Sequence, residues 1–177
     1  MLTGYQVAHP GKKLMFMGGE FGQWHEWRDY EDLAWGALQH PHHRQLQEWN
    51  RVLNRLYREY PQLHASEHSW EGFRWVEVDN HDESVFAFLR QRLPGEGGAP
   101  LLIALNCTPV PRDGYVFGVP APGRYQKILD SDALAFGGSG YSAQLDVTAE
   151  EAGWRDFPCR VRVTLPPLSM TVWRKEG

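Results

Sequence analysis

The sequence is poor in cysteine and has no long apolar run. Cys107 and Cys159 are the two cysteines among 177 residues, and two cysteines do not make a disulfide framework. We expect both to be buried free thiols in a reducing cytoplasm. No apolar run approaches the roughly 20 residues that cross a bilayer, and the amino end carries no charged-then-apolar signal segment. These absences predict a cytoplasmic protein that makes no contact with a membrane.

An excess of basic residues is also missing. The chain has 18 lysines and arginines against 22 aspartates and glutamates, which gives a formal net charge of −4. The basic residues are scattered along the chain, so we expect no nucleic-acid partner.

A metal or cofactor motif is not evident either. His40, His42 and His43 lie close in sequence, but consecutive histidines on a helix point to different faces. The run His25-Glu26-Trp27 lacks the second histidine of a zinc-binding helix motif. The glycine-rich residues 136–140 do not lie between a strand and a helix, as a phosphate-binding loop does. We therefore predict no metal site and no cofactor.

Apolar and aromatic residues, by contrast, are plentiful. Hydrophobic residues make up 42% of the chain, enough for a core, and eight of them are tryptophans. Tryptophans fill cores, but they also form flat platforms on which ring-shaped ligands stack.

The first 60 residues are typical of an alternating α/β architecture. A helix is expected to end near His9, before Pro10-Gly11. Residues 12–17 then predict a buried strand, because residues 14–17 are an unbroken apolar run. Glycines punctuate the turn that follows, and residues 18–41 form a long loop with possible helical turns, of the length that is usually functional. Apolar residues three and four apart predict a helix over residues 42–60, stopped by Pro61.

From residue 61 onward the apolar period changes to two. Residues 160–165 alternate most clearly, with valines expected in the core and arginines in water. The boundary between the two parts falls near residues 61–69, and the spacing of the strands favours an antiparallel β-sandwich over residues 61–177. The acidic stretch at residues 146–156 is expected to be a solvated loop. The strands are predicted at residues 73–78, 84–91, 101–107, 115–118, 124–129, 142–147, 159–165 and 170–174.

Four residues of the long loop are candidates for binding a ligand. In parallel α/β folds chemistry occurs in the loops beyond the carboxyl ends of strands, and Glu20 directly follows the predicted strand. Trp24, Trp27 and Trp35 could line a sugar groove, or could simply pack the loop onto the body of the protein. Glycoside chemistry needs two carboxyl groups, and no second carboxylate has a comparable position, so a structural or hydrogen-bonding role is expected for Glu20.

These segments together resemble the carboxyl-terminal part of bacterial 1,4-α-glucan (glycogen) branching enzymes, which are members of the α-amylase superfamily. The resemblance spans nearly the whole chain, and the motifs occur in the family's order. The motifs are HPGKKLMFMGGEFGQ at 9–23, EW at 26–27, LNRLYR at 53–58, GFRW at 72–75, NCTPVPR at 106–112, DSD at 130–132, GGSG at 137–140 and TLPPL at 164–168.

The resemblance implies a fold and a chemistry. Residues 1–60 would be the last strand and helix of a (β/α)8 barrel, and residues 61–177 the carboxyl-terminal β-domain, an α+β fragment as a whole. Such enzymes cleave an α-1,4 glucan link, hold a covalent glycosyl-carboxylate intermediate and pass the chain to a 6-hydroxyl. The family's aspartate nucleophile, glutamate acid/base, further aspartate and flanking histidines all precede the glycine-rich motif. None maps onto this sequence, so the chain is expected to be an inactive fragment. Its expected partner is α-glucan, bound as part of the parent enzyme.

The sequence departs from the family at two positions. Ala34 stands where the family often has an aspartate, and Cys107 replaces a usual aromatic residue. These departures leave room for another α-glucan-acting enzyme with the same scaffold. A second function class is a separable sugar-binding or interaction module formed by the β-domain, which a glucan pull-down of residues 61–177 would test. The apolar residues 14–17 also predict self-association through residues 1–40, because exposed apolar strand edges recruit other chains, or strong mobility of these residues if the chain stays monomeric.

Overall fold

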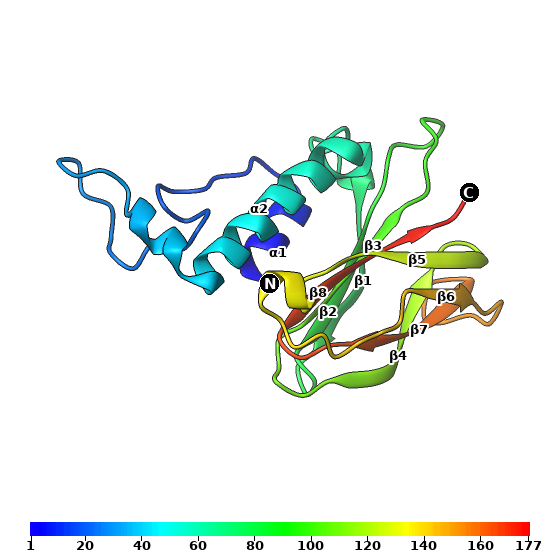
Figure 1. Cartoon of the computed structure of the whole chain (residues 1–177). Coiled ribbons are helices and arrows are strands. Elements are labelled where there is room, and N and C mark those ends of the chain that lie inside the picture. Colours follow the sequence, from blue (N-terminus) through cyan, green and yellow to red (C-terminus); the bar gives the residue numbers. More distant parts are fainter.

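The computed structural model describes all residues from Met1 to Gly177. Two helices lie against one face of a β-sandwich, and a long segment between them projects away from the body (Figure 1). The helices are α1 (Leu2–Ala8) and α2 (Pro41–Glu59); short 3-10 turns are η1 (Trp35–Gln39), η2 (Pro61–Leu63), η3 (Trp70–Gly72) and η4 (Leu134–Phe136). The strands are β1 (Phe73–Asn80), β2 (Val85–Arg90), β3 (Leu101–Asn106), β4 (Arg112–Val119), β5 (Gly123–Asp130), β6 (Asp146–Ala149), β7 (Cys159–Leu165) and β8 (Ser169–Lys175).

The strands form two antiparallel sheets. Six strands follow the order β1-β2-β3-β8-β5-β6, and β4 pairs with β7 in a second sheet. One hydrophobic core lies between the sheets and includes Leu102, Phe117, Val163 and Trp173. The alternation predicted for residues 160–165 is confirmed, because Val161 and Val163 are buried while the intervening arginine is exposed. The all-β antiparallel prediction is therefore confirmed.

A second core lies on the other face of the six-stranded sheet. Trp49, Leu53 and Leu56 of α2 pack there with Ile103 and Val172 of the sheet. The predicted helix is confirmed with bounds one residue earlier, and Pro41 occupies its first turn, where a missing N–H costs nothing. The helices thus cover a sheet face that would otherwise expose large apolar side chains.

A buried arginine joins the helices to the sheet. Arg90 of β2 is fully buried. Its guanidinium donates to the carbonyl oxygen of Ala8 at 2.6 Å and to that of Leu63 at 3.0 Å. These carbonyl groups belong to the last residues of α1 and η2, so one side chain satisfies the ends of two segments.

The structure overturns the strand predicted at residues 12–17. Residues 12–16 form neither a strand nor a helix. Leu14 is 76% exposed and Phe16 63% exposed. An apolar run becomes a buried strand only where neighbouring strands pair with it, and no strand of this chain does. The assignment of residues 1–60 to a barrel is not tested by this observation.

Two further differences concern one cysteine and one strand. Cys159 is a buried free thiol, whereas Cys107 is a free thiol on the surface, so its predicted burial is wrong. The strand predicted at residues 142–147 is displaced to Asp146–Ala149. The other predicted strands begin and end close to the observed ones. No helix combines the length and the apolar character needed to cross a membrane.

The shared helix–sheet core predicts a large stability difference between two substitutions in α2. Leu53 is 1% exposed, so Leu53→Ala should lower the free energy of unfolding by about 2–5 kcal/mol through lost contacts and a cavity. Arg55→Ala, on the exposed side of the helix, should change it by no more than about 0.5 kcal/mol. Urea unfolding followed by circular dichroism measures both. Equal losses would show that α2 does not pack on the sheet.

Candidate functional site

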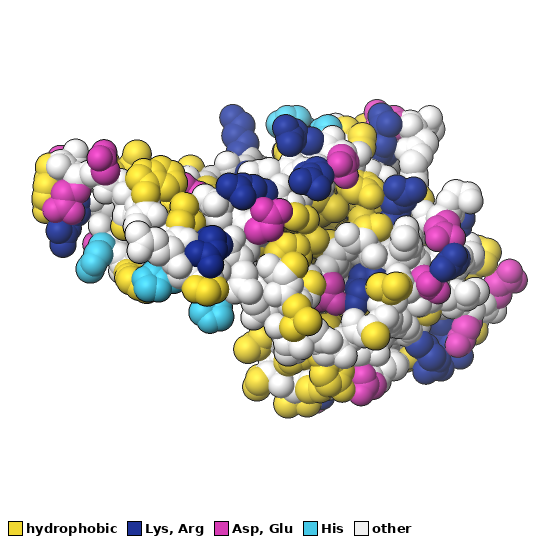
Figure 2. Space-filling view, viewed as in Figure 1, with side chains coloured by type: hydrophobic (Ala, Val, Ile, Leu, Met, Phe, Trp, Pro, Cys, Tyr) yellow, Lys and Arg dark blue, Asp and Glu magenta, His cyan; other side chains and the backbone are white.

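The candidate residues lie on the segment that leaves the body of the protein, which we call the aromatic arm (residues 18–40). It runs out from the extended residues after α1 and returns through η1 into α2 (Figure 1). Hydrophobic side chains gather on its surface, at the left of Figure 2. The exposed fractions are 68% for Trp24, 38% for Trp27, 75% for Tyr30 and 52% for Trp35. This is a large exposure of aromatic surface for a segment without a sheet or long helix of its own.

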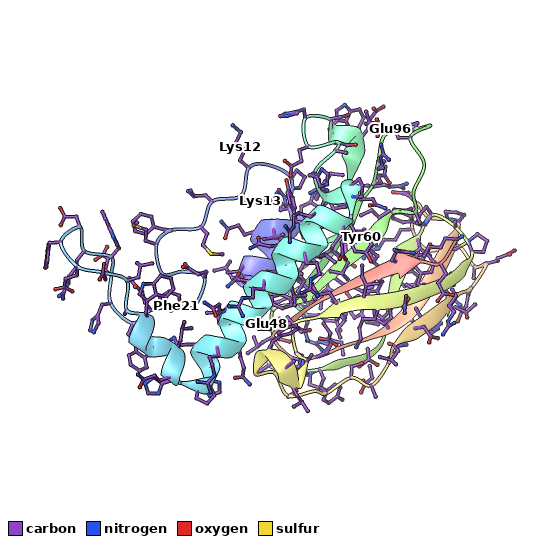
Figure 3. The ribbon with its side chains drawn as sticks, turned by 45° about the horizontal axis from the view of Figure 1, so that its top comes forward. Lys12, Lys13, Phe21, Glu48, Tyr60 and Glu96 are labelled. Atoms are coloured by element: carbon purple, nitrogen blue, oxygen red, sulfur yellow. The ribbon has the colours of Figure 1, made fainter.

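The base of the arm is fixed to α2 by Phe21. Its side chain is fully buried and lies beside the start of α2 in Figure 3. Nδ1 of His43 donates to the Phe21 carbonyl oxygen at 2.8 Å, so that nitrogen carries the proton. Nδ2 of Asn50 donates to the neighbouring Glu20 carbonyl oxygen, also at 2.8 Å. The buried ring and the two bonds set the direction in which the arm leaves.

The segment before the arm is tied by an ion pair to the residues between η2 and η3. Nζ of Lys13 lies 3.1 Å from the Glu67 carboxylate. Partial burial lowers the pKa of Lys13, and the hydrogen bond to Glu67 opposes this shift. The pair positions the extended residues that lead from α1 to the arm.

A glycine turn shapes the beginning of the arm. Gly18 has φ +81°, and a Cβ there would lie 2.3 Å from Cδ of Gln23. The close approach lets the Gln23 side chain bridge the arm. Its Oε1 accepts from the Ala34 N–H at 3.2 Å, and its Nε2 donates to the His25 carbonyl oxygen at 2.9 Å. The glycine requirement thus follows from the Gln23 side chain, which connects the outgoing and returning halves of the arm.

The three predicted tryptophans share the arm but not one groove. Trp24 lines a hollow of about 270 Å³ with His40, whose ring centroid is 5.1 Å away. Trp27 lines a separate hollow of about 240 Å³ with Phe16, and these two rings meet edge-on at 5.8 Å. Trp35 lines neither hollow, because it lies against the ring of the buried Phe21 at 5.1 Å. His25 lines both hollows, so the arm presents two adjoining aromatic surfaces.

Glu20 contributes its backbone to the architecture. Its carbonyl oxygen is held by Asn50, whereas its carboxylate enters no hydrogen bond or ion pair. It lines neither hollow; Glu26 is the one carboxylate that does, beside Trp27. Neither hollow thus has the two facing carboxyl groups that glycoside chemistry uses. No group of three or more histidine, cysteine, aspartate or glutamate side chains is placed to hold a metal ion.

The predicted solvated loop at residues 146–156 is partly wrong, and the error hid a polar cluster. This stretch contains β6, and its Arg155 forms an ion pair with the buried Glu77 of β1 at 2.6 Å. Strand alternation places Glu77 on the face opposite Val76, yet both are buried. A buried carboxylate next to a buried valine follows from an irregularity of the strand, which alternation alone does not reveal.

Comparison with known proteins gives matches to both parts of the chain. The family model described as alpha amylase, C-terminal all-beta domain, matches residues 75–176. The 1,4-alpha-glucan branching enzyme GlgB of Cupriavidus pinatubonensis is 47% identical over 174 residues, which are 98% of this chain and 23% of that protein. The enzyme of the same name from Albidiferax ferrireducens is 48% identical over 172 residues, 97% of this chain and 27% of that protein.

A third relative is likewise several times longer than this chain. The 1,4-alpha-glucan branching enzyme GlgB of Marinobacter nauticus is 43% identical over 174 residues, 98% of this chain and 27% of that protein. The chain thus spans about a quarter of the length of the curated relatives it matches. The identity covers the helices and the aromatic arm as well as the β-domain.

Proposed function

The chain belongs to the family of the α-amylase C-terminal all-beta domain, and from this premise we propose that it is part of a 1,4-α-glucan branching enzyme. The observation that carries the proposal is the reach of the similarity. The family model begins at residue 75, but identity to branching enzymes covers 98% of the chain. It therefore includes the arm and α2, which a generic β-domain would not share.

In this proposal the parent enzyme moves α-1,4 glucan segments to 6-hydroxyl groups. Residues 1–60 would form the last strand and helix of its (β/α)8 barrel, and residues 61–177 its β-domain. The unpaired residues 12–16 and their exposed apolar side chains support this, since a barrel would supply partners for both. The two free thiols agree with a reducing cytoplasm.

We further propose that the aromatic arm binds the α-glucan. A glucose ring has apolar C–H faces, which stack on aromatic rings, and a rim of hydroxyl groups. Trp24, Trp27 and Trp35 offer exposed rings on one rigidly anchored segment. The Glu20 carboxylate has no protein partner and is available to accept from sugar hydroxyls. The separate hollows suit successive contacts along a chain rather than one deep pocket.

Residues 1–177 alone should neither branch nor hydrolyse amylose. Retaining glycoside chemistry needs a nucleophile and an acid/base about 5–5.5 Å apart, and no hollow of the arm holds such a pair. Iodine staining and reducing ends should stay unchanged over a long incubation. The branching enzyme of Cupriavidus pinatubonensis serves as the positive control. Activity above a buffer blank that survives repurification would contradict the expectation.

Removing an arm ring should weaken glucan binding. Trp24→Ala and Trp27→Ala should each raise the dissociation constant for maltoheptaose about threefold to tenfold, the loss expected for one aromatic contact. Tyr30→Ala is the matched control, because Tyr30 is exposed on the same arm but lines neither hollow. Titrations followed by NMR measure the affinities. Equal effects of all three substitutions would refute specific binding at the hollows.

We also infer that the exposed apolar residues before the arm drive self-association. Leu14 and Phe16 point large apolar surfaces to solvent, and exposed extended segments recruit other chains. The double substitution Leu14→Lys and Phe16→Lys should shift sedimentation toward monomer. In a monomer the amides of residues 12–17 should exchange rapidly with deuterium. Slow exchange there in a sample proven monomeric by sedimentation would overturn the inference.

A further inference from the structure

We propose that the β-domain carries a second saccharide-binding site, far from the aromatic arm. It is a hollow of about 240 Å³ between β1, β4 and the loop from β6 to β7, lined by Trp154, Tyr115 and the Glu77–Arg155 pair. Figure 1 shows β4 and the orange loop at the opposite end of the molecule from the arm. The identification of its ligand as an α-glucan rests on the proposed function; the existence of the site does not.

Backbone irregularities from three segments converge on this hollow. The pairing of β1 with β2 shifts register on both sides of Glu77, and that of β4 with β7 shifts just before Tyr115. Arg155 has φ +51°, a left-handed conformation that is unfavourable for a residue with a side chain. Bulges re-aim side chains and strained residues cluster at binding sites. Here they turn Glu77 and Arg155 toward one point.

The central ion pair gives the hollow a floor with no net charge. Glu77 is 4% exposed. Its oxygens meet the Arg155 guanidinium at 2.8 Å and 2.6 Å in a two-point contact. A bare carboxylate would attract a cation and a bare guanidinium an anion, but each neutralises the other. Glu83, the second carboxylate of the lining, is paired with Arg112 at 3.5 Å. The ligand that fits is uncharged and hydrogen-bonds at several points.

The remaining groups match the two sides of a sugar ring. Nδ2 of Asn80 donates to the Tyr115 hydroxyl at 2.6 Å, so the hydroxyl hydrogen is left for a ligand oxygen. Burial raises the pKa of Tyr115, which keeps that hydrogen in place at neutral pH. The Trp154 indole offers a flat apolar face and an N–H donor. A pyranose presents C–H faces to such a ring and vicinal hydroxyls to such donors and acceptors.

The test is a titration of isotopically labelled residues 1–177 with maltoheptaose, read at the eight indole N–H signals. Trp154→Phe assigns the Trp154 signal, and the buried Trp173 reports that variants stay folded. The Trp154 signal should shift progressively with ligand. Tyr115→Phe keeps the ring and removes the hydroxyl, so the dissociation constant read at Trp154 should rise about threefold to tenfold.

Matched variants separate this site from the arm. Tyr141→Phe removes an exposed hydroxyl elsewhere on the β-domain and should leave the response of Trp154 unchanged. Trp24→Ala should likewise leave it unchanged while the arm loses affinity. A Trp154 signal that shifts while the arm signals stay still would support this site and count against glucan binding by the arm.

Two results would overturn the inference. A Trp154 signal that stays fixed while the arm signals saturate would refute the site and leave the proposed function standing. A loss of affinity as large for Tyr141→Phe as for Tyr115→Phe would refute the assigned position. Cellohexaose, with β-1,4 links, is the ligand control. An equal shift with cellohexaose would support a saccharide site but reject the α-glucan as its specific ligand.

Discussion

The structure depends on one constraint, which is that β3 must be covered on both faces. Every residue of β3 is buried. Leu102 and Ala104 face the core between the two sheets, whereas Leu101, Ile103 and Leu105 face the helices. Without α1 and α2 the second set would be exposed to water, at a free-energy cost of about 25 cal/mol for each Å² of apolar surface. The helices are therefore part of the β-domain's own stability, although the family model covers the strands alone.

That constraint also fixes the aromatic arm. Once α2 is packed on the sheet, its His43 and Asn50 donate to the carbonyl groups of Phe21 and Glu20. Arg90 connects the same sheet to the end of α1 through the Ala8 carbonyl. The segments on both sides of the arm are thus attached to the same layer, the six-stranded sheet with α2 packed on it. The buried ring of Phe21 and the hydrogen bonds to these backbone carbonyl groups hold the base of the arm against α2.

The sequence predicted what is encoded locally and missed what depends on neighbours. The period of α2 and the alternation of β7 are properties of single segments, and both were predicted correctly. The apolar residues 14–17 have the composition of a strand, but pairing requires a partner that composition does not specify. Likewise, the aromatic residues of the arm were identifiable, whereas their division between separate hollows depends on Phe21 and the glycine turn. Glu77 was missed because register shifts overrode alternation.

The two proposed saccharide surfaces have a consequence that neither has alone. Each is shallow and built on few rings, so each would bind a short glucan weakly. They lie at opposite ends of one body (Figure 1), on either side of the six-stranded sheet and its helices. A polymer bound to one surface would bind the other at a raised effective concentration. This requires a polymer long enough to span the distance between the two surfaces. A rigid body with two weak surfaces therefore discriminates by chain length. Short oligosaccharides would gain nothing from the second surface, whereas long α-glucans would be held at two points.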